Sequence, residues 1–249
     1  MPDPALQRLR LTYSKGEAIR FISNLDLIRL WERAARRAGL PLAYSQGFNP
    51  QPKIANAHAL PVGCAGSNEV MDLWLTERLS PAEVARRLRA ALPPAVRLTH
   101  VEEVDPRLPS LQSLVREAEY RARVWTDESA NALDARVQAL LAAASLPRRR
   151  RRHDQIVEYD LRPLVMDLRL EGREGRWLTL WMRLRAEPSA TGRPDEVLEA
   201  LGLADCPCRL VRERLLFAWA ARGRGRVRGL PSCSLFLSAE RGMEEATIS

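Results

Sequence analysis

A chain of 249 residues has room for one large domain or for two domains of roughly 120 residues each. With 46% hydrophobic and 28% charged residues, its composition excludes a chain that is disordered throughout. The formal net charge of +8 favours an anionic partner, such as nucleic acid.

The sequence does not indicate a membrane protein or a secreted one. No apolar run approaches the roughly 18 residues that a membrane span needs. The N-terminal segment Met1–Pro4 lacks the charged-then-apolar pattern of a signal peptide. Four cysteines in a chain of this length do not form the pattern of a disulfide framework. We therefore expect a cytoplasmic protein without a membrane partner.

Nearly all of the 39 basic residues are arginine, because only Lys15 and Lys53 are lysine. Such a bias can reflect a GC-rich genome, and it says nothing about binding by itself. The positions of the arginines are therefore more informative than their number.

The first half predicts an alternation of strands and helices. Leu9, Leu11 and Tyr13 alternate with polar residues, which is the period of a half-buried strand. Ser23 is suited to cap a helix that has Asp26 in its first turn. The other predicted elements are a strand near Lys53–Leu60, a strand at Val70–Leu75, a helix that begins after Ser80 and a strand at Val96–Val101.

The second half repeats this order. Its patterns predict a strand at Glu119–Trp125, a helix at Asn131–Leu146, strands at Glu158–Leu170 and Trp177–Arg185, a helix from Pro194 and a strand at Arg209–Phe217. Two consecutive βαββαβ units are typical of tandem ferredoxin-like halves of the α+β class, with antiparallel sheets. We expect the halves at 1–108 and 109–220, followed by a flexible, basic tail at 221–249 that is rich in glycine and arginine.

One face of the second predicted sheet combines arginine with tryptophan. Strand alternation places on the face opposite the helices Arg121, Arg123, Trp125, Trp177, Trp181, Arg183, Arg185, Arg212 and Arg214. Guanidinium groups that neutralise phosphates and rings that stack on bases are typical of RNA-binding surfaces. Two other interpretations stay open: the arginines pair with Glu119, Glu187 or Glu213 on a solvated face, or the tryptophans pack against the first half.

Five consecutive arginines follow the predicted helix Asn131–Leu146: Arg148, Arg149, Arg150, Arg151 and Arg152. Such a run is costly to bury, so we expect an exposed loop that attracts polyanions. The run indicates a general affinity for nucleic acid and no particular target. We expect RNA as a partner and no specificity for DNA.

The segment Tyr44–Ile54 has an unusual composition for a connector. Gly47 permits backbone angles that other residues avoid, while Pro50 and Pro52 stiffen the path on either side of Gln51. A ligand would be recognised by the side chains or backbone of Tyr44, Ser45, Gly47, Phe48, Asn49, Gln51 and Lys53. The alternative is an ordered turn whose polar groups satisfy only the local backbone.

Several motifs in this order carry a family resemblance. They are RFISNLD at Arg20–Asp26, RRAGLP at Arg36–Pro41, YSQGFNPQPKI at Tyr44–Ile54 and LPVG at Leu60–Gly63. With them, the first half resembles the bacterial radical SAM-associated (radical SAM-linked) proteins of unknown function. The motif YDLRP, which contains Asp160 and Arg162, fits the second half of that family.

The resemblance implies a partner. In that family the domain stands alone or is fused behind a radical SAM protein, and it is often encoded near ribosomal-protein genes. A role beside a radical SAM protein, on RNA or the translation apparatus, is therefore implied, without an established activity. The family usually has histidine where Asn24 and Gln51 stand here. Because amides do not titrate near neutrality, these two positions favour recognition over proton transfer.

No catalytic centre is evident from the residues. The cysteines lack the CxxxCxxC spacing of a radical SAM cluster, and Cys64, Cys206, Cys208 and Cys233 fit no common zinc spacing. We therefore predict neither a metal nor another cofactor. The candidates for acid–base catalysis are Asp26, Asp72 and His58.

The hypothesis that the sequence favours is an accessory RNA-binding protein. It would work with a radical SAM enzyme and present or recognise an RNA or translation-related substrate. One alternative is an RNA-modifying or RNA-cleaving enzyme with an active site between the two halves. Another alternative is a protein-interaction adaptor that binds no RNA.

Overall fold

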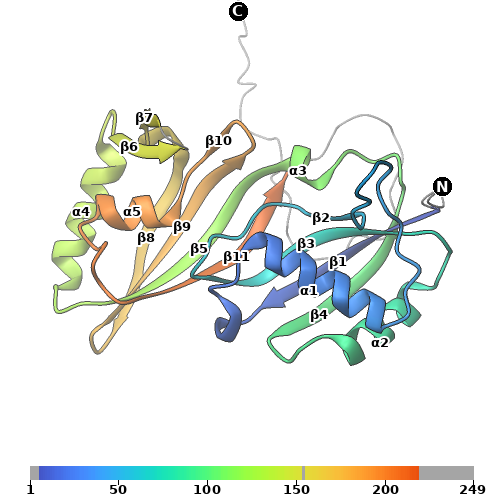
Figure 1. The fold of residues 1–249 in the computed structure, drawn as a ribbon. Helices are drawn as coiled ribbons and strands as arrows, with labels where there is room; N and C mark the ends of the chain where they lie inside the picture. The colour runs from blue at the N-terminus through green and yellow to red at the C-terminus, as the bar shows by residue number, and fades with distance from the viewer. Residues whose placement is uncertain (1–5, 153–154, 219–249) are drawn as a thin grey trace, which may run out of the picture.

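The computed structural model describes residues 6–152 and 155–218, which form a mixed α+β fold (Figure 1). In this part of the chain, a nine-stranded, mostly antiparallel sheet has the order β10-β9-β5-β11-β3-β1-β4, with β2 added to β3 and β8 added to β9. A separate two-stranded sheet pairs β6 with β7. The α+β class is therefore confirmed. No helix among these residues is long and apolar enough to span a bilayer.

The first half supplies four strands of the large sheet. Its elements are β1 (Gln7–Lys15), η1 (Glu17–Ile19), α1 (Asn24–Arg37), β2 (Ile54–Asn56), β3 (Cys64–Leu75), α2 (Pro81–Ala91) and β4 (Val96–Val104). The strands lie in the order β4-β1-β3-β2, and each neighbouring pair is antiparallel. The predicted caps form, because Ser23 Oγ accepts the N–H of Asp26 and Ser80 Oγ accepts the N–H of Glu83.

The second half repeats that strand order. Its elements are α3 (Leu111–Leu114), β5 (Val115–Trp125), α4 (Ala130–Ala142), β6 (Pro147–Arg152), β7 (Gln155–Asp160), η2 (Arg162–Leu164), β8 (Val165–Glu174), β9 (Trp177–Glu187), β10 (Ala190–Thr191), α5 (Pro194–Ala200) and β11 (Cys208–Phe217). The main strands lie in the order β11-β5-β9-β8, so both halves place their fourth strand beside their first.

Two predictions about the strands are wrong. The halves do not have separate sheets, because β11 pairs antiparallel with β5 and parallel with β3 and thereby joins the two. The predicted strand Glu158–Leu170 is two strands, β7 and β8, with η2 between them. Pro163 lies in η2, and proline cannot donate a hydrogen bond to a sheet ladder.

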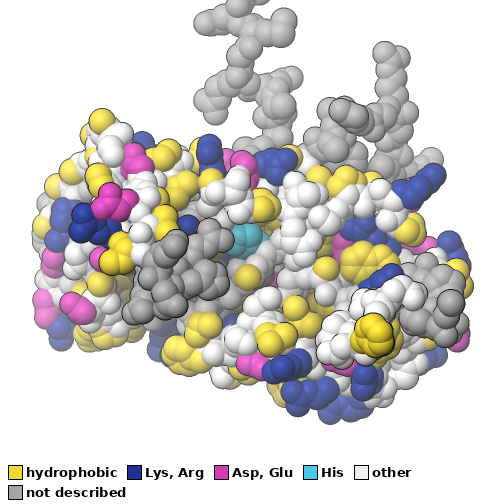
Figure 2. All heavy atoms as spheres, turned by 45° about the horizontal axis from the view of Figure 1, so that its top comes forward, with side chains coloured by type: hydrophobic (Ala, Val, Ile, Leu, Met, Phe, Trp, Pro, Cys, Tyr) yellow, Lys and Arg dark blue, Asp and Glu magenta, His cyan; other side chains and the backbone are white. Residues whose placement is uncertain are grey.

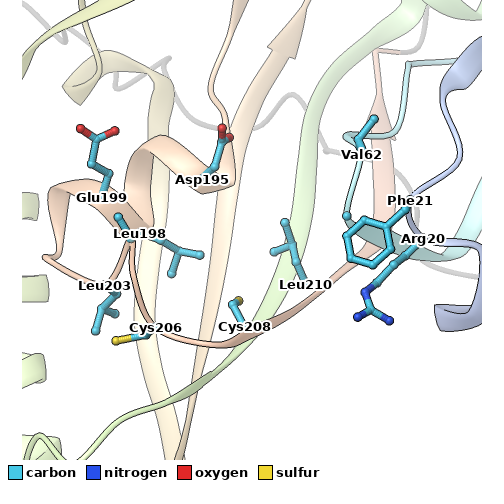
Figure 3. A pocket seen from close by; sticks show the side chains of 12 residues that line it. Arg20, Phe21, Val62, Asp195, Leu198, Glu199, Leu203, Cys206, Cys208 and Leu210 are labelled. Carbon is cyan, nitrogen blue, oxygen red and sulfur yellow. The ribbon is translucent and has the colours of Figure 1, made fainter.

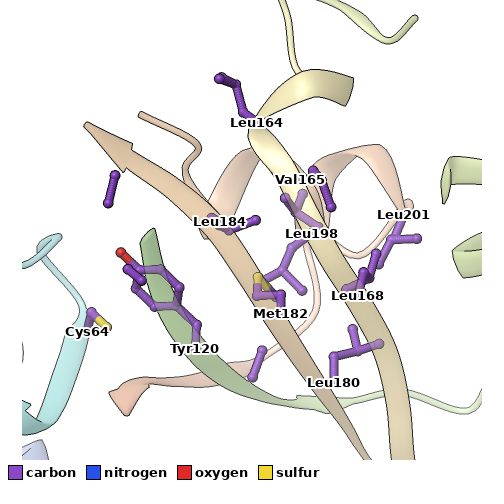
Figure 4. Close-up of a cluster of buried hydrophobic side chains, with 14 of the residues drawn as sticks. Cys64, Tyr120, Leu164, Val165, Leu168, Leu180, Met182, Leu184, Leu198 and Leu201 are labelled. Atoms are coloured by element: carbon purple, nitrogen blue, oxygen red, sulfur yellow. The ribbon is translucent and has the colours of Figure 1, made fainter. Parts of the chain in front are cut away.

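Two hydrophobic clusters hold the helices on the sheet. In the first half, α1 and α2 pack on β1 and β3, with Trp31 fully buried among them. In the second half, α4 and α5 pack on β5, β8 and β9, and this cluster extends to Cys64 in β3. Figure 4 shows Cys64 beside Tyr120 of β5. The two halves therefore share buried contacts at their junction.

The connector after β4 crosses the first half of the sheet. Arg8 in β1 donates to the carbonyl of Leu108 at 2.6 Å and to that of Pro109 at 3.0 Å. Gln112 then donates to the carbonyl of Asn56 at 2.6 Å. These contacts tie the start of the second half to the strands of the first.

A candidate binding cleft between the two halves

A cleft of about 380 Å3 lies between the two halves (Figure 3). The first half contributes Arg20 and Phe21, which precede α1, and Val62 and Gly63, which precede β3. These four residues belong to the motifs RFISNLD and LPVG. The second half contributes, from α5, the connector after it and the start of β11, Asp195, Leu198, Glu199, Leu203, Ala204, Cys206, Cys208 and Leu210.

The cleft has an apolar rim with charges of both signs. Phe21 is 67% exposed and Val62 is 63% exposed, which is unusual for large apolar side chains. The guanidinium of Arg20 lies over the Phe21 ring, 4.4 Å from its centroid. Asp195 and Glu199 stand on the opposite side (Figure 3). This mixture suits a polypeptide side chain better than a phosphate backbone.

A buried lysine holds the turn that carries Arg20 and Phe21. Lys15 is only 1% exposed, and its Nζ donates to the carbonyls of Arg20 at 3.1 Å and Ile22 at 3.3 Å. Burial lowers the pKa of Lys15. The N–H of Gly63 donates to the same Arg20 carbonyl at 2.9 Å. The two first-half loops of the cleft are therefore joined to each other.

A buried ion pair holds the loop that leads to the cleft. Arg212 is 0% exposed, and its Nε donates to Glu69 Oε1 at 2.9 Å. Its other nitrogens donate to the carbonyls of His58 at 2.9 Å and Ala59 at 3.1 Å. Gly66 leaves room for the carboxylate, since a Cβ there would lie 2.6 Å from Glu69 Cγ. These contacts position the chain just before the LPVG motif.

The prediction that Arg212 shares the open face with Arg214 is wrong. Arg212 lies opposite Tyr120 in the ladder and Arg214 lies opposite Glu119, so a β-bulge at Glu213 turns Arg212 inward. The sequence carries no sign of this bulge, since β11 has no glycine. The buried role of Arg212, together with those of Lys15 and Glu69, was therefore missed.

The cleft contains two free cysteines, Cys206 and Cys208. Burial raises the pKa of Cys208 to about 11 and that of Cys64, in the neighbouring core, to about 12. These two are therefore thiols near neutral pH. Among the described residues, no group of three or more His, Cys, Asp or Glu side chains is arranged to hold a metal ion. Cys233 lies outside the described residues.

The five consecutive arginines form a strand, so the prediction of a loop is wrong. They occupy β6, which pairs with β7 in register, Arg149 lying opposite Glu158. Arg149 and Glu158 form an ion pair at 2.7 Å, and both are largely exposed. The guanidinium of Arg150 lies over the Tyr159 ring, 4.9 Å from its centroid. The side chains of Arg151 and Arg152 lie outside the described part, as do His153 and the predicted tail from 221.

A hollow of about 420 Å3 lies beside this hairpin. Its lining includes Arg148, Arg149 and Glu158 from the hairpin and Glu199 from α5. Because Glu199 also lines the cleft between the halves, the two concave surfaces meet at α5.

Asp160 and Arg162 fix the base of the hairpin through backbone contacts. Asp160 Oδ1 accepts the N–H groups of Leu146 at 2.7 Å and of Arg162 at 2.9 Å, and these bonds lower the pKa of its carboxyl. The guanidinium of Arg162 donates to the carbonyls of Leu141 at 2.9 Å and Val165 at 2.8 Å. The YDLRP motif therefore connects the hairpin to α4 and β8.

The open face of the second half is a network of ion pairs. The pairs are Arg121–Glu213 at 2.8 Å, Arg121–Glu171 at 3.2 Å, Arg123–Glu174 at 2.7 Å, Arg183–Glu117 at 3.3 Å and Arg214–Glu119 at 2.6 Å. Arg185 lies directly opposite Glu117 in the ladder. This geometry favours the interpretation of a solvated, internally paired face over that of free phosphate ligands.

The tryptophans of this face are largely covered. Trp181 is only 7% exposed, and the guanidinium of Arg169 lies 3.9 Å from its ring centroid. Trp177 meets Trp125 edge-on, with centroids 5.2 Å apart, and Arg123 lies 5.5 Å from the Trp177 centroid. A base could stack here only after these guanidinium groups moved.

The segment Tyr44–Ile54 is an ordered loop that projects its tip into solvent. Tyr44 forms a bridge with Pro52, the Ser45 N–H donates to the Gln51 carbonyl at 2.8 Å, and Ser45 Oγ accepts the Gln51 N–H at 2.9 Å. Gly47 has a φ of 131°, which other residues rarely adopt. The local bonds expected of an ordered turn are therefore present, and they leave the tip free for a ligand.

The positions Asn24 and Gln51 have different surroundings. Asn24 Oδ1 accepts a hydrogen bond from Asn56 Nδ2 at 2.8 Å, which links the start of α1 to β2. The hydroxyl of Tyr13 donates to Asn56 Oδ1 at 3.4 Å. The side chain of Gln51 is exposed on the loop. Asn24 therefore has a packing role, while Gln51 is available to a partner.

Asp26 and His58 do not share a site. Asp26 is exposed, and the hydroxyl of Ser23 donates to it at 2.7 Å, which lowers the pKa of Asp26. His58 Nδ1 lies 3.2 Å from Arg212 Nη1, and burial, followed by the charge of Arg212, lowers the pKa of His58. Neither Asp26 nor His58 lines the cleft.

Asp72 is a buried partner of two arginines. It is 1% exposed, and its carboxylate accepts from Arg8 Nε at 2.9 Å and from Arg10 Nε at 2.9 Å. These bonds lie between β1 and β3, away from the residues that line the cleft. The geometry favours a structural role for Asp72.

A family model described as an uncharacterized protein conserved in bacteria (DUF2344) matches residues 8–194. This chain belongs to that family. The match includes β1 to β9, both first-half motifs of the cleft, the basic hairpin and the start of α5. A comparison with curated proteins gives no match.

A comparison with solved structures gives matches at low identity. A structure titled "Crystal Structure of a Cbf5-Nop10-Gar1 Complex" has 12% identity and a TM-score of 0.46, over 85% of this chain and 49% of that one. Another, "Structure of H/ACA RNP bound to a substrate RNA containing 2'-deoxyuridine", has 11% identity and a TM-score of 0.43, over 83% and 47%. The chain thus spans about half the length of these proteins. Likeness at this level supports no functional conclusion.

Proposed function

We propose that this protein is an accessory RNA-binding protein, which grips RNA with the β6–β7 hairpin and works with a radical SAM enzyme. The observation that carries the RNA part is a strand of five consecutive arginines, Arg148–Arg152. In the opposite strand, Asp160 is engaged with backbone N–H groups, and Glu158 forms only an exposed pair. Exposed pairs contribute about 0–1 kcal/mol, so phosphate groups can replace this glutamate.

The fold supports the prediction of two tandem ferredoxin-like halves. In each half the fourth strand lies beside the first, and the helices that connect the strands pack on the sheet. Tandem units of this kind leave loops and hairpins of both halves free to contact one partner.

Removing the charges of Arg148, Arg149 and Arg150 tests this proposal. The triple variant R148Q/R149Q/R150Q should bind single-stranded RNA more weakly and with less dependence on salt. Three lost phosphate contacts should reduce the slope of log K against log [salt] by about 2, at roughly 0.7 for each contact. Fluorescence anisotropy of a labelled oligonucleotide between 50 and 200 mM salt, roughly the range in which such slopes are measured, gives this slope.

A matched variant controls for net charge. Basic side chains also gather along the first half (Figure 2). In the sequence of that half, Arg78, Arg86 and Arg107 are exposed, and each pairs with a neighbouring carboxylate. The variant R78Q/R86Q/R107Q loses the same charge and should keep most of the slope. Equal losses in the two variants would assign binding to overall charge and contradict a role of the hairpin.

The family resemblance supports a radical SAM enzyme as the partner. We propose that this enzyme binds at the cleft between the halves. The apolar rim of Phe21 and Val62 is exposed, and it is built from motif residues. The variant F21S should capture at least about tenfold less radical SAM enzyme than the wild type, since burial of one aromatic ring is worth more than 1.4 kcal/mol. Quantitative mass spectrometry of material captured with the full-length chain measures this loss.

RNA binding provides the internal control for that experiment. F21S should bind the anisotropy oligonucleotide as the wild type does, because Phe21 is not part of the hairpin. The variant L25S, which changes another exposed apolar side chain outside the cleft, should retain the partner. Capture of a radical SAM enzyme that is equal in all three proteins would overturn the assignment to the cleft.

A further inference from the structure

Phe48 is the most exposed large apolar side chain in the described chain. Its relative exposed area is 113%, which means that no neighbouring group covers the ring. An isolated ring in water gains nothing for the stability of the fold, because burial is what makes apolar side chains stabilising. The Phe48 ring is therefore available to a binding partner that would cover it.

The loop under Phe48 is built to hold that exposure. Bonds between Ser45 and Gln51 close the base of the loop on both sides, and Lys53 N–H donates to the Ala43 carbonyl at 2.8 Å. Arg36 at the end of α1 donates to Tyr44 Oη at 3.0 Å. Because the base is fixed, the tip loses little freedom when it binds a ligand.

The residues around the ring match a nucleic acid better than a protein surface. The segment Tyr44–Ile54 contains no acidic residue, and it contains Lys53. Asn49 and Gln51 are exposed, and their amides both donate and accept, as the edges of bases do. Arg36 adds a cation at the base of the loop, although it also pairs with Glu32 at 2.8 Å.

We propose that Phe48 is a stacking platform for an unpaired base of RNA, with the amides of Asn49 and Gln51 next to the edge of that base. The proposal rests on the RNA binding proposed above, and it names the substrate class as single-stranded RNA or an unpaired loop. Bases inside a duplex are already stacked on one another, so the ring has no access to their faces.

The test compares F48A with F48W on a 12-nucleotide single-stranded RNA that carries one 2-aminopurine, and on the matching duplex. F48A should bind the single strand about thirtyfold more weakly, the middle of the range for one stacked base. F48W should bind as the wild type does and quench 2-aminopurine fluorescence. The salt slope should stay unchanged in both variants, because no charge is lost. Duplex binding should not respond to either variant.

A control variant accompanies this test, and its outcomes distinguish a failure of the stacking inference from a failure of the proposed RNA binding. L25A removes an exposed apolar side chain from α1 and should leave RNA binding unchanged. If F48A binds the single strand as tightly as the wild type, the stacking inference is overturned while the role of the hairpin stands. If the wild-type chain binds neither RNA, the proposed function fails and the inference fails with it. Loss of protein capture alone in F48A would assign the loop to a protein partner instead.

Discussion

Replacing Glu69 with alanine should destabilise the fold by about 3–5 kcal/mol, because the guanidinium of Arg212 would stay buried without its counter-ion. Arg212 is 0% exposed and Glu69 is 3% exposed, so water cannot take the place of the missing carboxylate without rearrangement. The same arginine donates to the carbonyls of His58 and Ala59, which lead into the cleft. Urea unfolding followed by tryptophan fluorescence measures the change in the free energy of unfolding.

A double variant distinguishes the effect of an unpaired buried charge from the effect of lost side-chain volume. E69L/R212M replaces both charges by apolar groups, and such replacements of buried pairs are often neutral or stabilising. We therefore expect the double variant to be more stable than E69A. A loss of less than about 1 kcal/mol in E69A would place this pair among solvated surface pairs and contradict its burial.

Replacing Asp72 with alanine should have an effect of similar size, about 3–5 kcal/mol, because it leaves Arg8 buried and unpaired. Arg8 is 2% exposed, and Arg10, which shares the carboxylate, is 15% exposed. This result would matter for function as well as for stability. An activity lost in D72A would report unfolding, so it would be no evidence that Asp72 takes part in catalysis.

Asp26 supplies the matched comparison for D72A. Its carboxylate is exposed at the start of α1, where it contacts Ser23 and Arg29. Ser23 supplies the cap itself and is kept in this variant, so D26A should unfold only slightly more easily than the wild type. Thermal and urea unfolding of both variants give the comparison. A D72A protein as stable as D26A would show that Arg8 finds other partners.

The regular parts of the fold could be predicted because their residues obey simple periods. Leu9, Leu11 and Tyr13 alternate with polar residues, and all three are buried. The caps at Ser23 and Ser80 depend on contacts within four residues, which a sequence displays directly. Local patterns of this kind were sufficient to predict the order of most helices and strands and the α+β class.

The contacts between distant strands could not be predicted in the same way. Nothing in the residues of β11 shows that it pairs with β3 as well as with β5, because pairing between strands far apart in the chain depends on the whole fold. The bulge at Glu213 reversed the orientation of Arg212, since one extra residue changes the face of each side chain beyond it.

The five consecutive arginines at 148–152 were predicted only in part. Their charge predicted exposure, but five arginines also fit an exposed strand, and the pairing with β7 depends on residues that follow the run. The motif loops were named from the sequence, yet only the fold brings Arg20 and Val62 to the same cleft as α5. The second-half lining, including Glu199 and Cys208, had no motif to mark it.

The position of β11 has a consequence for synthesis on the ribosome. The strand that joins the two halves is the last strand of the described chain, whereas its partners β3 and β5 emerge much earlier. Until Cys208–Phe217 leaves the exit tunnel, an edge of β3 and an edge of β5 have unpaired backbone groups. Open strand edges of this kind are sites of aggregation. We therefore expect a nascent chain stalled before this strand to be more prone to aggregation than the finished chain.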